Sequence, residues 1–365
     1  MPLSKEALAS QALINKKFGA GTLVLASEVP NRLPLTTGSL GVDIALGGGW
    51  PSNQWSEVVG RESSSKTSLA YMTLFANQQR DPNFTALWVA AEAYNSRWAE
   101  SLGVDNSRVH LASTNRMEQA YEILVHSAES RAYDLLVLDS YPALVAEQEE
   151  EKSMDDMVVG LGARRTGQFF RKVGHSMGRS LVSEEKPVVG LFINQFRKAI
   201  GAFSPQGTPN TTPGGEAKNY AFYARLELAR TEYIDESIPG KNMKRRVGQT
   251  VKAKAIKNKQ TAPHKVASYD FYFENAPQHG FRAGQHDRVK ELVTLGVLYD
   301  VIGRRGGGWY DTPGNSYKGE PALLEAIRED TELQAVLDRD IRTAAFGGAG
   351  ITLAAVEDDE LPEAA

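Results

Sequence analysis

The chain has 365 residues, 41% hydrophobic and 24% charged, and its formal net charge of −4 excludes a uniformly basic nucleic-acid-binding protein. It contains no cysteine, which excludes disulfides, thiolate zinc sites and cysteine nucleophiles. The N-terminus lacks the apolar core of a signal peptide, and no apolar run approaches the roughly 20 residues of a membrane-spanning helix. We therefore expect a soluble, cytoplasmic protein with no membrane partner.

The first segment, residues 1–34, has the pattern of a docking arm. Apolar positions at helical spacing over residues 4–18 predict a short amphipathic helix that ends at Gly19. A helix of this length cannot form a core alone, so we expect it to dock on another surface. Pro30 and Pro34 mark the break that follows it.

Residues 35–274 alternate between short β-rich runs and stretches long enough for helices. This alternation predicts an α/β fold with a mostly parallel, twisted sheet. The predicted strands are Trp55–Val59, Thr85–Ala90, Leu135–Leu138 and Val188–Ile193. Two long insertions interrupt the pattern, an acidic one at about 147–160 and one rich in Gly, Pro, Thr and Asn at about 196–215. Insertions of that length are usually functional or disordered.

The last third of the chain changes character. Residues 241–265 carry nine Lys or Arg and no acid, and their alternation near Val251 predicts an exposed strand. Helical periodicity follows, with Trp309-Tyr310 between two helical runs, so residues 275–345 are predicted to form a small C-terminal α/β domain. Residues 346–365 are predicted to be an acidic, disordered tail.

The strongest chemical motif is Gly60-Arg61-Glu62-Ser63-Ser64-Ser65-Lys66-Thr67, between an apolar strand and a helical run. This is the context of the phosphate-loop motif G-x-x-x-x-G-K-[ST], in which backbone N–H groups and a helix N-terminus hold phosphate oxygens. Lys66 would reach the β- and γ-phosphates, and Thr67 would hold Mg²⁺. Ser65 stands where the motif has glycine. On this stretch alone, a serine-rich loop with a solvated Lys66 remains the alternative.

Two acidic residues follow other predicted strands. Asp139 ends an apolar run roughly 70 residues after Lys66, where an aspartate of phosphate-loop ATPases positions magnesium through water. Alone it would be interpreted as a helix N-cap, but with Lys66 it favours ATP binding. Glu92 follows another β-rich run, and a carboxylate there can polarise an attacking water. Its position alone does not distinguish that role from an ordinary surface glutamate.

These motifs, in this order, resemble the bacterial RecA-type recombinases over about residues 5–345. The resemblance extends well beyond the phosphate loop. Its other motifs are Thr37-Gly38-Ser39-Leu40, Asp43-Ile44-Ala45-Leu46-Gly47, Ala91-Glu92, Asp139-Ser140, Phe192-Ile193-Asn194-Gln195 with Arg197, Thr211-Thr212 with Gly214-Gly215, Lys257-Asn258-Lys259 with Ala262-Pro263 and Lys265, and Gly308-Trp309-Tyr310. The last three of these groups, which begin with Thr211, Lys257 and Gly308, are far more specific than a phosphate loop.

The resemblance implies a RecA-type ATPase core that uses ATP and Mg²⁺ and forms a helical homo-oligomeric filament on single-stranded DNA. The residues implied to bind the nucleotide are Gly60, Glu62, Ser63, Ser64, Ser65, Lys66, Thr67, Ser68, Trp98, Asp139 and Ser140. Thr67 would bind Mg²⁺ directly, and Asp139 would bind it through water. The N-terminal helix and a following strand would pack on the next protomer.

The resemblance also implies roles in catalysis and DNA binding. Glu92 would be the general base, Lys66 would meet the phosphates, Gln195 would sense the γ-phosphate, and Lys257 and Lys259 would reach a neighbour's γ-phosphate. The residues implied to contact DNA are Val159, Gly160, Arg164, Arg171, Arg197, Ile200, Gly214 and Gly215.

The sequence therefore predicts a DNA-dependent ATPase that pairs single-stranded with double-stranded DNA and exchanges strands. Two departures from the family pattern stand out: Ser65 adds a side chain within the phosphate loop, and Glu216 places an acid beside the DNA residues. Two alternatives remain open. One is an ATP-binding DNA filament protein with little hydrolysis, and the other is a hexameric helicase with the same ATPase core.

Overall fold

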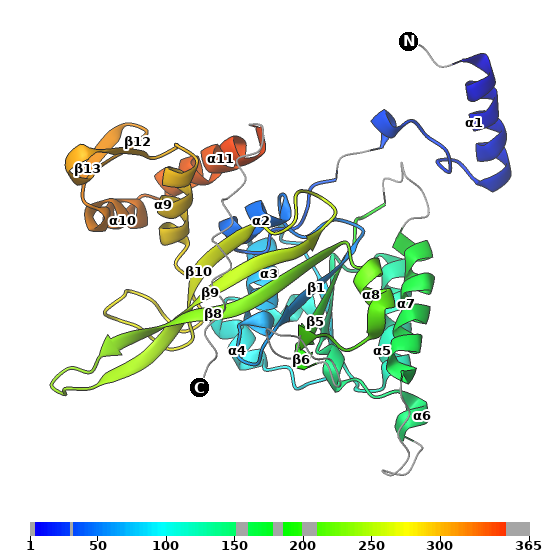
Figure 1. Cartoon of the computed structure of the whole chain (residues 1–365), viewed down its shortest axis with the longest axis horizontal. Coiled ribbons are helices and arrows are strands. Elements are labelled where there is room, and N and C mark those ends of the chain that lie inside the picture. Colours follow the sequence, from blue (N-terminus) through cyan, green and yellow to red (C-terminus); the bar gives the residue numbers. More distant parts are fainter. Residues whose placement is uncertain (1–3, 30–31, 151–159, 178–184, 199–209, 348–365) are drawn as a thin grey trace, which may run out of the picture.

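The computed structural model describes residues 4–29, 32–150, 160–177, 185–198 and 210–347. Its centre is one large sheet (Figure 1). The strands of that sheet are β1 (Trp55–Gly60), β2 (Ala86–Ala90), β3 (Val109–Ser113), β4 (Leu135–Asp139), β5 (Val189–Gln195), β8 (Ala224–Ser237), β9 (Lys244–Asn258) and β10 (Val266–Tyr272). Their order is β10-β9-β8-β1-β5-β4-β2-β3, and the run from β8 to β3 is parallel. The predicted mostly parallel α/β sheet is confirmed.

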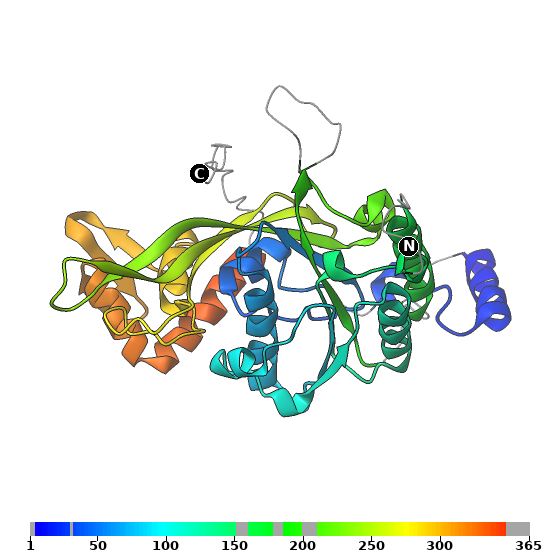
Figure 2. The ribbon, with the colours of Figure 1, turned by 90° about the horizontal axis from the view of Figure 1, so that it is seen from below.

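Helices cover both faces of this sheet (Figure 2). The helices of this region are α2 (Leu40–Leu46), α3 (Lys66–Arg80), α4 (Ser96–Ser101), α5 (Met117–Ser130), α7 (Leu161–Met177) and α8 (Gly215–Ala221), and the short α6 (Glu147–Glu150) lies beyond the end of α7. Alternate residues of β4 enter two apolar clusters: Leu135 packs in the cluster that includes α3, and Leu136 packs in the cluster that includes α5 and α7. The central strands are therefore buried on both faces, which is why they are almost continuously apolar in the sequence.

The basic strand near Val251 corrects one expectation. The sequence predicts an exposed strand, but β9 lies inside the sheet between β8 and β10. Val251, Ala253 and Ala255 are fully buried, whereas Lys252 and Lys254 lie on the opposite face and are half-buried. Alternation reveals one buried face, but it cannot show whether a strand lies at the edge or inside a sheet.

The N-terminal arm lies away from the sheet in Figure 1. Helix α1 (Lys5–Phe18) confirms the predicted helix, and it has no buried residue. Its side chains Leu8, Leu13 and Phe18 are 51%, 70% and 65% exposed. The described residues between α1 and residue 34 form a 3₁₀ turn at Ala26–Glu28 and no strand. Strand pairing there requires a partner, so the predicted docking strand stays a prediction for an assembled form.

The C-terminal region combines helices with a small sheet, as predicted. Its elements are α9 (Arg288–Leu298), β11 (Gly303–Arg305), β12 (Trp309–Thr312), β13 (Asn315–Lys318), α10 (Glu320–Glu329) and α11 (Thr331–Gly347). Its apolar core takes Leu40 and Ile44 from α2. That short helix therefore joins this region to the large sheet. Among the described helices, none is long and apolar enough to span a bilayer.

A buried ionisable pair lies where α9 meets α2. Glu291 Oε1 accepts hydrogen bonds from Ser39 Oγ at 2.5 Å and Gly41 N at 3.2 Å, and Oε2 lies 3.5 Å from His286 Nε2. Burial raises the pKa of Glu291 to about 8 and lowers the pKa of His286 to about 4. At neutral pH both side chains are therefore uncharged, and the contact between them is not an ion pair.

We expect the free energy of unfolding to fall as the pH rises from about 6.5 to about 8, and Glu291→Gln to remove this fall. The folded chain keeps the Glu291 proton up to about pH 8, whereas the unfolded chain loses it near 4.5, so rising pH favours unfolding by at most about 1.4 kcal/mol per pH unit. His286 opposes this effect below its ordinary value of 6.5. Urea unfolding at several pH values tests the prediction, with Glu325→Gln, an exposed position on α10, as control. Parallel pH profiles of Glu291→Gln and the unchanged chain would contradict it.

Candidate functional site

The loop after β1 has the geometry of a phosphate cradle. At Gly60, a Cβ atom would lie 2.4 Å from both Leu228 O and Ser64 Oγ, so only glycine fits where the strand ends. Helix α3 begins at Lys66, and its first hydrogen bond runs from Leu69 N to Ser65 O at 2.9 Å. The N–H groups in the first turn of a helix have no acceptor within the helix, which suits an anion.

Twelve described residues line a cleft of about 270 Å³ at the carboxyl ends of β1, β2, β4 and β5. They are Glu62, Ser63, Ser64, Ser65, Lys66, Thr67, Ser68, Glu92, Asp139, Ser140, Ile193 and Gln195. All except Ile193 are site residues predicted from the sequence. The parallel sheet thus brings together residues that are far apart in the chain, at the edge where ligands of open α/β sheets bind.

Direct contacts join the phosphate loop, the end of β2 and the end of β4. Thr67 Oγ1 donates to Asp139 Oδ2 at 3.0 Å, and Ser140 Oγ donates to Glu92 Oε1. Lys66 Nζ donates to Arg61 O at 2.5 Å and so folds over the loop. The N–H of Glu92 donates to Asp139 O at 3.1 Å, which fixes the end of β2 against the end of β4.

The charges in the cleft favour a ligand that brings its own cation. The pKa of Asp139 is raised to about 6, because burial and the charge of Glu92 outweigh the opposing hydrogen bond from Thr67 and charge of Lys66. Burial lowers the pKa of Lys66, and the charges of Asp139, Glu92 and Glu62 act in the opposite direction. Mg²⁺ in proteins commonly takes one or two side-chain oxygens together with phosphate oxygens and water. The adjacent oxygens of Thr67 and Asp139 fit that requirement.

Comparison with known proteins agrees with the fold and this cleft. The family described as "RecA N-terminal domain" matches residues 5–277. The chain belongs to the RecA family. It is 33% identical over 353 residues to Protein RecA of Macrococcus caseolyticus (strain JCSC5402), which covers 96% of this chain and 93% of the relative. It is 34% identical over 362 residues to Protein RecA of Arthrobacter sp. (strain FB24), which covers 97% and 95%. It is therefore a divergent member of the RecA family along almost its whole length.

A buried charge network, which the sequence analysis missed, links the cleft to the second insertion. Glu57, fully buried on β1, accepts from Lys218 Nζ at 3.0 Å, from Arg225 Nε at 2.6 Å and from Asn194 Nδ2 at 2.8 Å. Lys218 Nζ also donates to Thr212 Oγ1 at 2.6 Å. Asn194 precedes Gln195, which lines the cleft, and Thr212 closes the insertion. A charge inside an apolar strand was the signal for this network, since buried charges require partners.

Lys257 and Lys259 lie apart from the cleft of their own subunit. Lys257 Nζ donates to the carbonyl oxygens of Asn219 and Tyr220, the latter at 3.0 Å, and Lys259 Nζ lies 3.3 Å from the same Tyr220 oxygen. These carbonyls end α8, where a helix attracts cations. Burial, together with the charges of Lys259 and Arg225, lowers the pKa of Lys257 to about 8. In a single subunit the two lysines therefore cap α8.

Trp98 does not line the cleft. It lies on α4 and packs, partly buried, against the apolar cluster that includes Tyr71 and Trp88. Gly60 also stays outside the lining, but the loop can pass this close to the end of β1 only because that residue is glycine. The role of Trp98 in binding the nucleotide stays a prediction.

The predicted DNA residues gather around α7, α8 and the stem of the second insertion. Arg164 and Arg171 are exposed on α7, which Gly160 precedes, and Arg197 is exposed on β6 (Arg197–Lys198). Strand β6 pairs with β7 (Asn210–Thr211), and Gly214 and Gly215 then begin α8. At Gly214 (φ 103°), a Cβ atom would lie 2.7 Å from Lys218 Cδ, so the turn requires glycine. Val159 and Ile200 lie outside the described residues.

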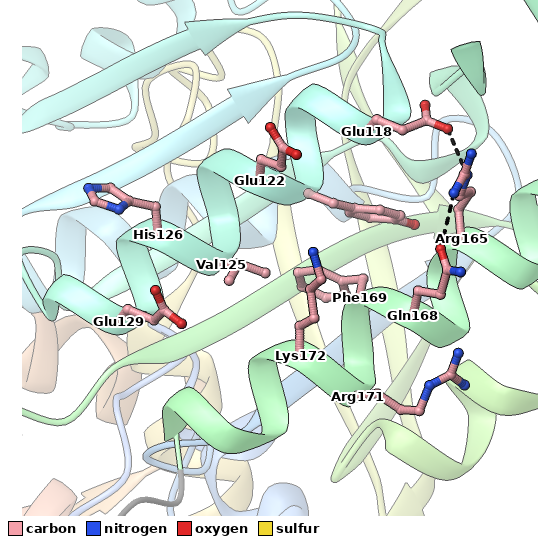
Figure 3. A pocket seen from close by; sticks show the side chains of 11 residues that line it. Glu118, Glu122, Val125, His126, Glu129, Arg165, Gln168, Phe169, Arg171 and Lys172 are labelled. Atoms are coloured by element: carbon pink, nitrogen blue, oxygen red, sulfur yellow. Dashed lines mark hydrogen bonds and ion pairs between the residues drawn. The ribbon is translucent and has the colours of Figure 1, made fainter. Parts of the chain in front are cut away.

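A larger cleft, of about 710 Å³, lies between α5 and α7 and takes no part in the nucleotide site. Figure 3 shows carboxylates of α5 opposite basic side chains of α7. Arg165 Nε lies 2.9 Å from Glu118 Oε1, and Arg171 lines the cleft from the α7 side. The two clefts share no lining residue.

Proposed function

We propose that the chain is a DNA-dependent ATPase that assembles as a filament on single-stranded DNA and exchanges strands with homologous duplex DNA. The observation that carries the proposal is the convergence, in one cleft, of a phosphate loop, the Thr67–Asp139 pair, Glu92 and Gln195. This set is the one that phosphoryl transfer to water requires: a cradle, metal ligands, a base and a polar sensor.

In this proposal each side chain has one task in the attack of water on the γ-phosphate. The loop and Lys66 would hold the β- and γ-phosphates, and Thr67 directly and Asp139 through water would hold Mg²⁺. When bound there, Mg²⁺ would supply positive charge against the phosphate oxygens. Glu92 orients the water and accepts its proton; the Ser140 hydroxyl donates to Oε1, and the second carboxylate oxygen remains to act as the base.

The Glu57 network supports coupling between nucleotide and DNA. Asn194 bonds both Glu57 and, at 3.3 Å, the carbonyl oxygen of Pro213, so a displacement at the end of β5 reaches the stem of the second insertion. The exposed Arg197 in that stem is placed to contact DNA phosphates. Such contacts carry no sequence information, so homology would be read by base pairing between the strands.

Two features support polymerisation. Helix α1 exposes Leu8, Leu13 and Phe18. Full burial of such a side chain against a neighbouring subunit would stabilise the assembly by about 1.5–3 kcal/mol. Strand β3 ends the sheet and leaves backbone groups open for pairing. In the filament, Lys257 and Lys259 would leave the end of α8 and approach the phosphates held by the next subunit.

The test is ATP hydrolysis with and without single-stranded DNA, together with electron microscopy of the assembly. We expect stimulation by DNA and open helical filaments. We also expect Glu92→Gln to lower hydrolysis at least 10²-fold while nucleotide binding persists, because only the base is removed. Glu329→Gln, an exposed glutamate on α10, is the control.

Each rival function predicts a different result. Closed rings would indicate the hexameric helicase. Filaments whose hydrolysis DNA fails to stimulate would indicate the filament protein with little hydrolysis. Loss of nucleotide binding in Glu92→Gln would show that Glu92 supports the fold of the cleft instead of acting as a base.

A further inference from the structure

Ser65 occupies a conformation that an L-amino acid rarely adopts. Its φ and ψ are 63° and 26°, in the left-handed region, at the residue before α3 begins. Ser63, two positions earlier, also has a positive φ of 57°. The phosphate-loop motif has glycine at the place of Ser65, where glycine adopts this conformation without strain. The structure therefore needs some contact that keeps a serine there.

Gln249 provides such a contact from another part of the sheet. Its side chain is only 5% exposed, on β9, which β8 separates from β1. The amide nitrogen Nε2 donates to Ser65 Oγ at 2.7 Å and to Ser63 O at 3.3 Å. One buried amide thus binds both left-handed residues of the loop. Without these acceptors the buried amide of Gln249 would be left unsatisfied, which costs free energy. The contact therefore stabilises the left-handed conformation of the loop.

We propose that Gln249 is a positioning residue of the phosphate loop, which holds Ser65 in the left-handed conformation that the motif otherwise obtains from glycine. The proposal rests on the proposed ATP-binding function. Lys66 and Thr67 follow Ser65 directly, so the backbone angles of Ser65 determine where the phosphate-binding amine, the Mg²⁺-binding hydroxyl and the first N–H groups of α3 point. Gln249 itself is not one of the described residues that line the cleft.

A double-mutant cycle tests this inference, with AMP-PNP and Mg²⁺ as the probe. Gln249→Met keeps the length of the side chain and removes the donor, and we expect nucleotide affinity to fall about tenfold, the scale of one left-handed residue left without support. In a Ser65→Gly background, the same substitution is expected to change affinity less than twofold, because glycine needs no support. Rescue by a substitution in the loop is a result that general destabilisation of β9 would not produce.

Ser65→Ala gives a second, independent arm. It removes the oxygen that Gln249 binds but keeps a Cβ atom, so affinity is expected to be about tenfold lower than in Ser65→Gly, in which the left-handed conformation carries no strain. This comparison decides the matter even if Gln249→Met fails to fold. The matched control is Gln78→Met on α3: Gln78 is 4% exposed and its Nε2 donates to Asp105 O at 3.0 Å, remote from the loop. We expect nucleotide affinity to be unchanged there.

Equal losses of affinity for Gln249→Met in the unchanged chain and in the Ser65→Gly background would overturn the proposal, and so would no loss in either. Thermal unfolding of the nucleotide-free variants separates it from the proposed function. If the unchanged chain fails to bind AMP-PNP, the ATPase proposal fails. If the thermal unfolding midpoints of the four variants in the cycle are also additive, the positioning role of Gln249 fails as well. Non-additive midpoints would keep the role of Gln249 in holding the loop.

Discussion

Lys66→Ala is expected to abolish ATP hydrolysis, with a loss of at least 10³-fold, and to remove strand exchange with it. Among the described residues that line the cleft, Lys66 is the only lysine or arginine, so no other cation of the subunit replaces it. Its amine already lies over the loop, bonded to the carbonyl oxygen of Arg61. Phosphate release, measured with and without single-stranded DNA, checks this result.

The contrary result is clear. Unchanged ATP turnover in Lys66→Ala would contradict the assignment of this loop as a phosphate loop, and the proposed function with it. Lys241→Ala, which changes an exposed lysine in the β8–β9 turn, is the control for loss of positive charge. The thermal unfolding midpoint of Lys66→Ala should be recorded as well, because its bond to Arg61 O contributes to the fold of the loop.

The second large effect is expected from Lys257→Ala, which should leave the subunit folded but remove DNA-stimulated hydrolysis. Lys257 lies at the end of α8 and not in the cleft of its own subunit, so a catalytic role requires a neighbour's cleft. A cation supplied in trans is worth about 10³–10⁵-fold in rate in other phosphoryl-transfer enzymes. Mixed with Glu92→Gln subunits, Lys257→Ala subunits should regain activity, since about a quarter of random head-to-tail interfaces would join an intact cleft to an intact lysine.

A mixture of Lys66→Ala with Glu92→Gln subunits is the matched control. Both changes lie in the cleft, so every interface in that mixture holds a defective cleft and no activity should return. Absence of recovery in the Lys257→Ala mixture, with co-assembly verified by electron microscopy, would contradict a site shared between subunits.

The cleft could be predicted from sequence because its residues belong to short local patterns. A strand, a loop and a helix in succession locate Lys66 and Thr67, and Asp139 and Glu92 each end a β-rich run. Parallel strands place their carboxyl ends at one edge, so locating the strands was enough to bring these residues together. The apolar Ile193 was missed as a lining residue because nothing distinguishes it from its buried neighbours.

The contacts that hold the site in place could not be predicted in this way. Gln249 lies 184 residues from Ser65 in the chain, and Lys218 lies 161 residues from Glu57. Whether such residues meet depends on the register of β9 against β8 and on the packing of α8, which no local pattern contains. The same reason explains why β9 was predicted to be exposed: its lysines indicate a polar face but not its neighbours in the sheet.

In the proposed filament, the bare surface of α1 would make the arm a sensor of subunit concentration. None of the side chains of α1 enters the apolar clusters of the sheet, so removing this helix costs the core no buried contact. In a dilute solution, the link at residues 19–29 would be as open to a protease as any loop, and it would become protected only as subunits meet. The assembled state can therefore be followed by the rate at which the arm is cut, without nucleotide or DNA.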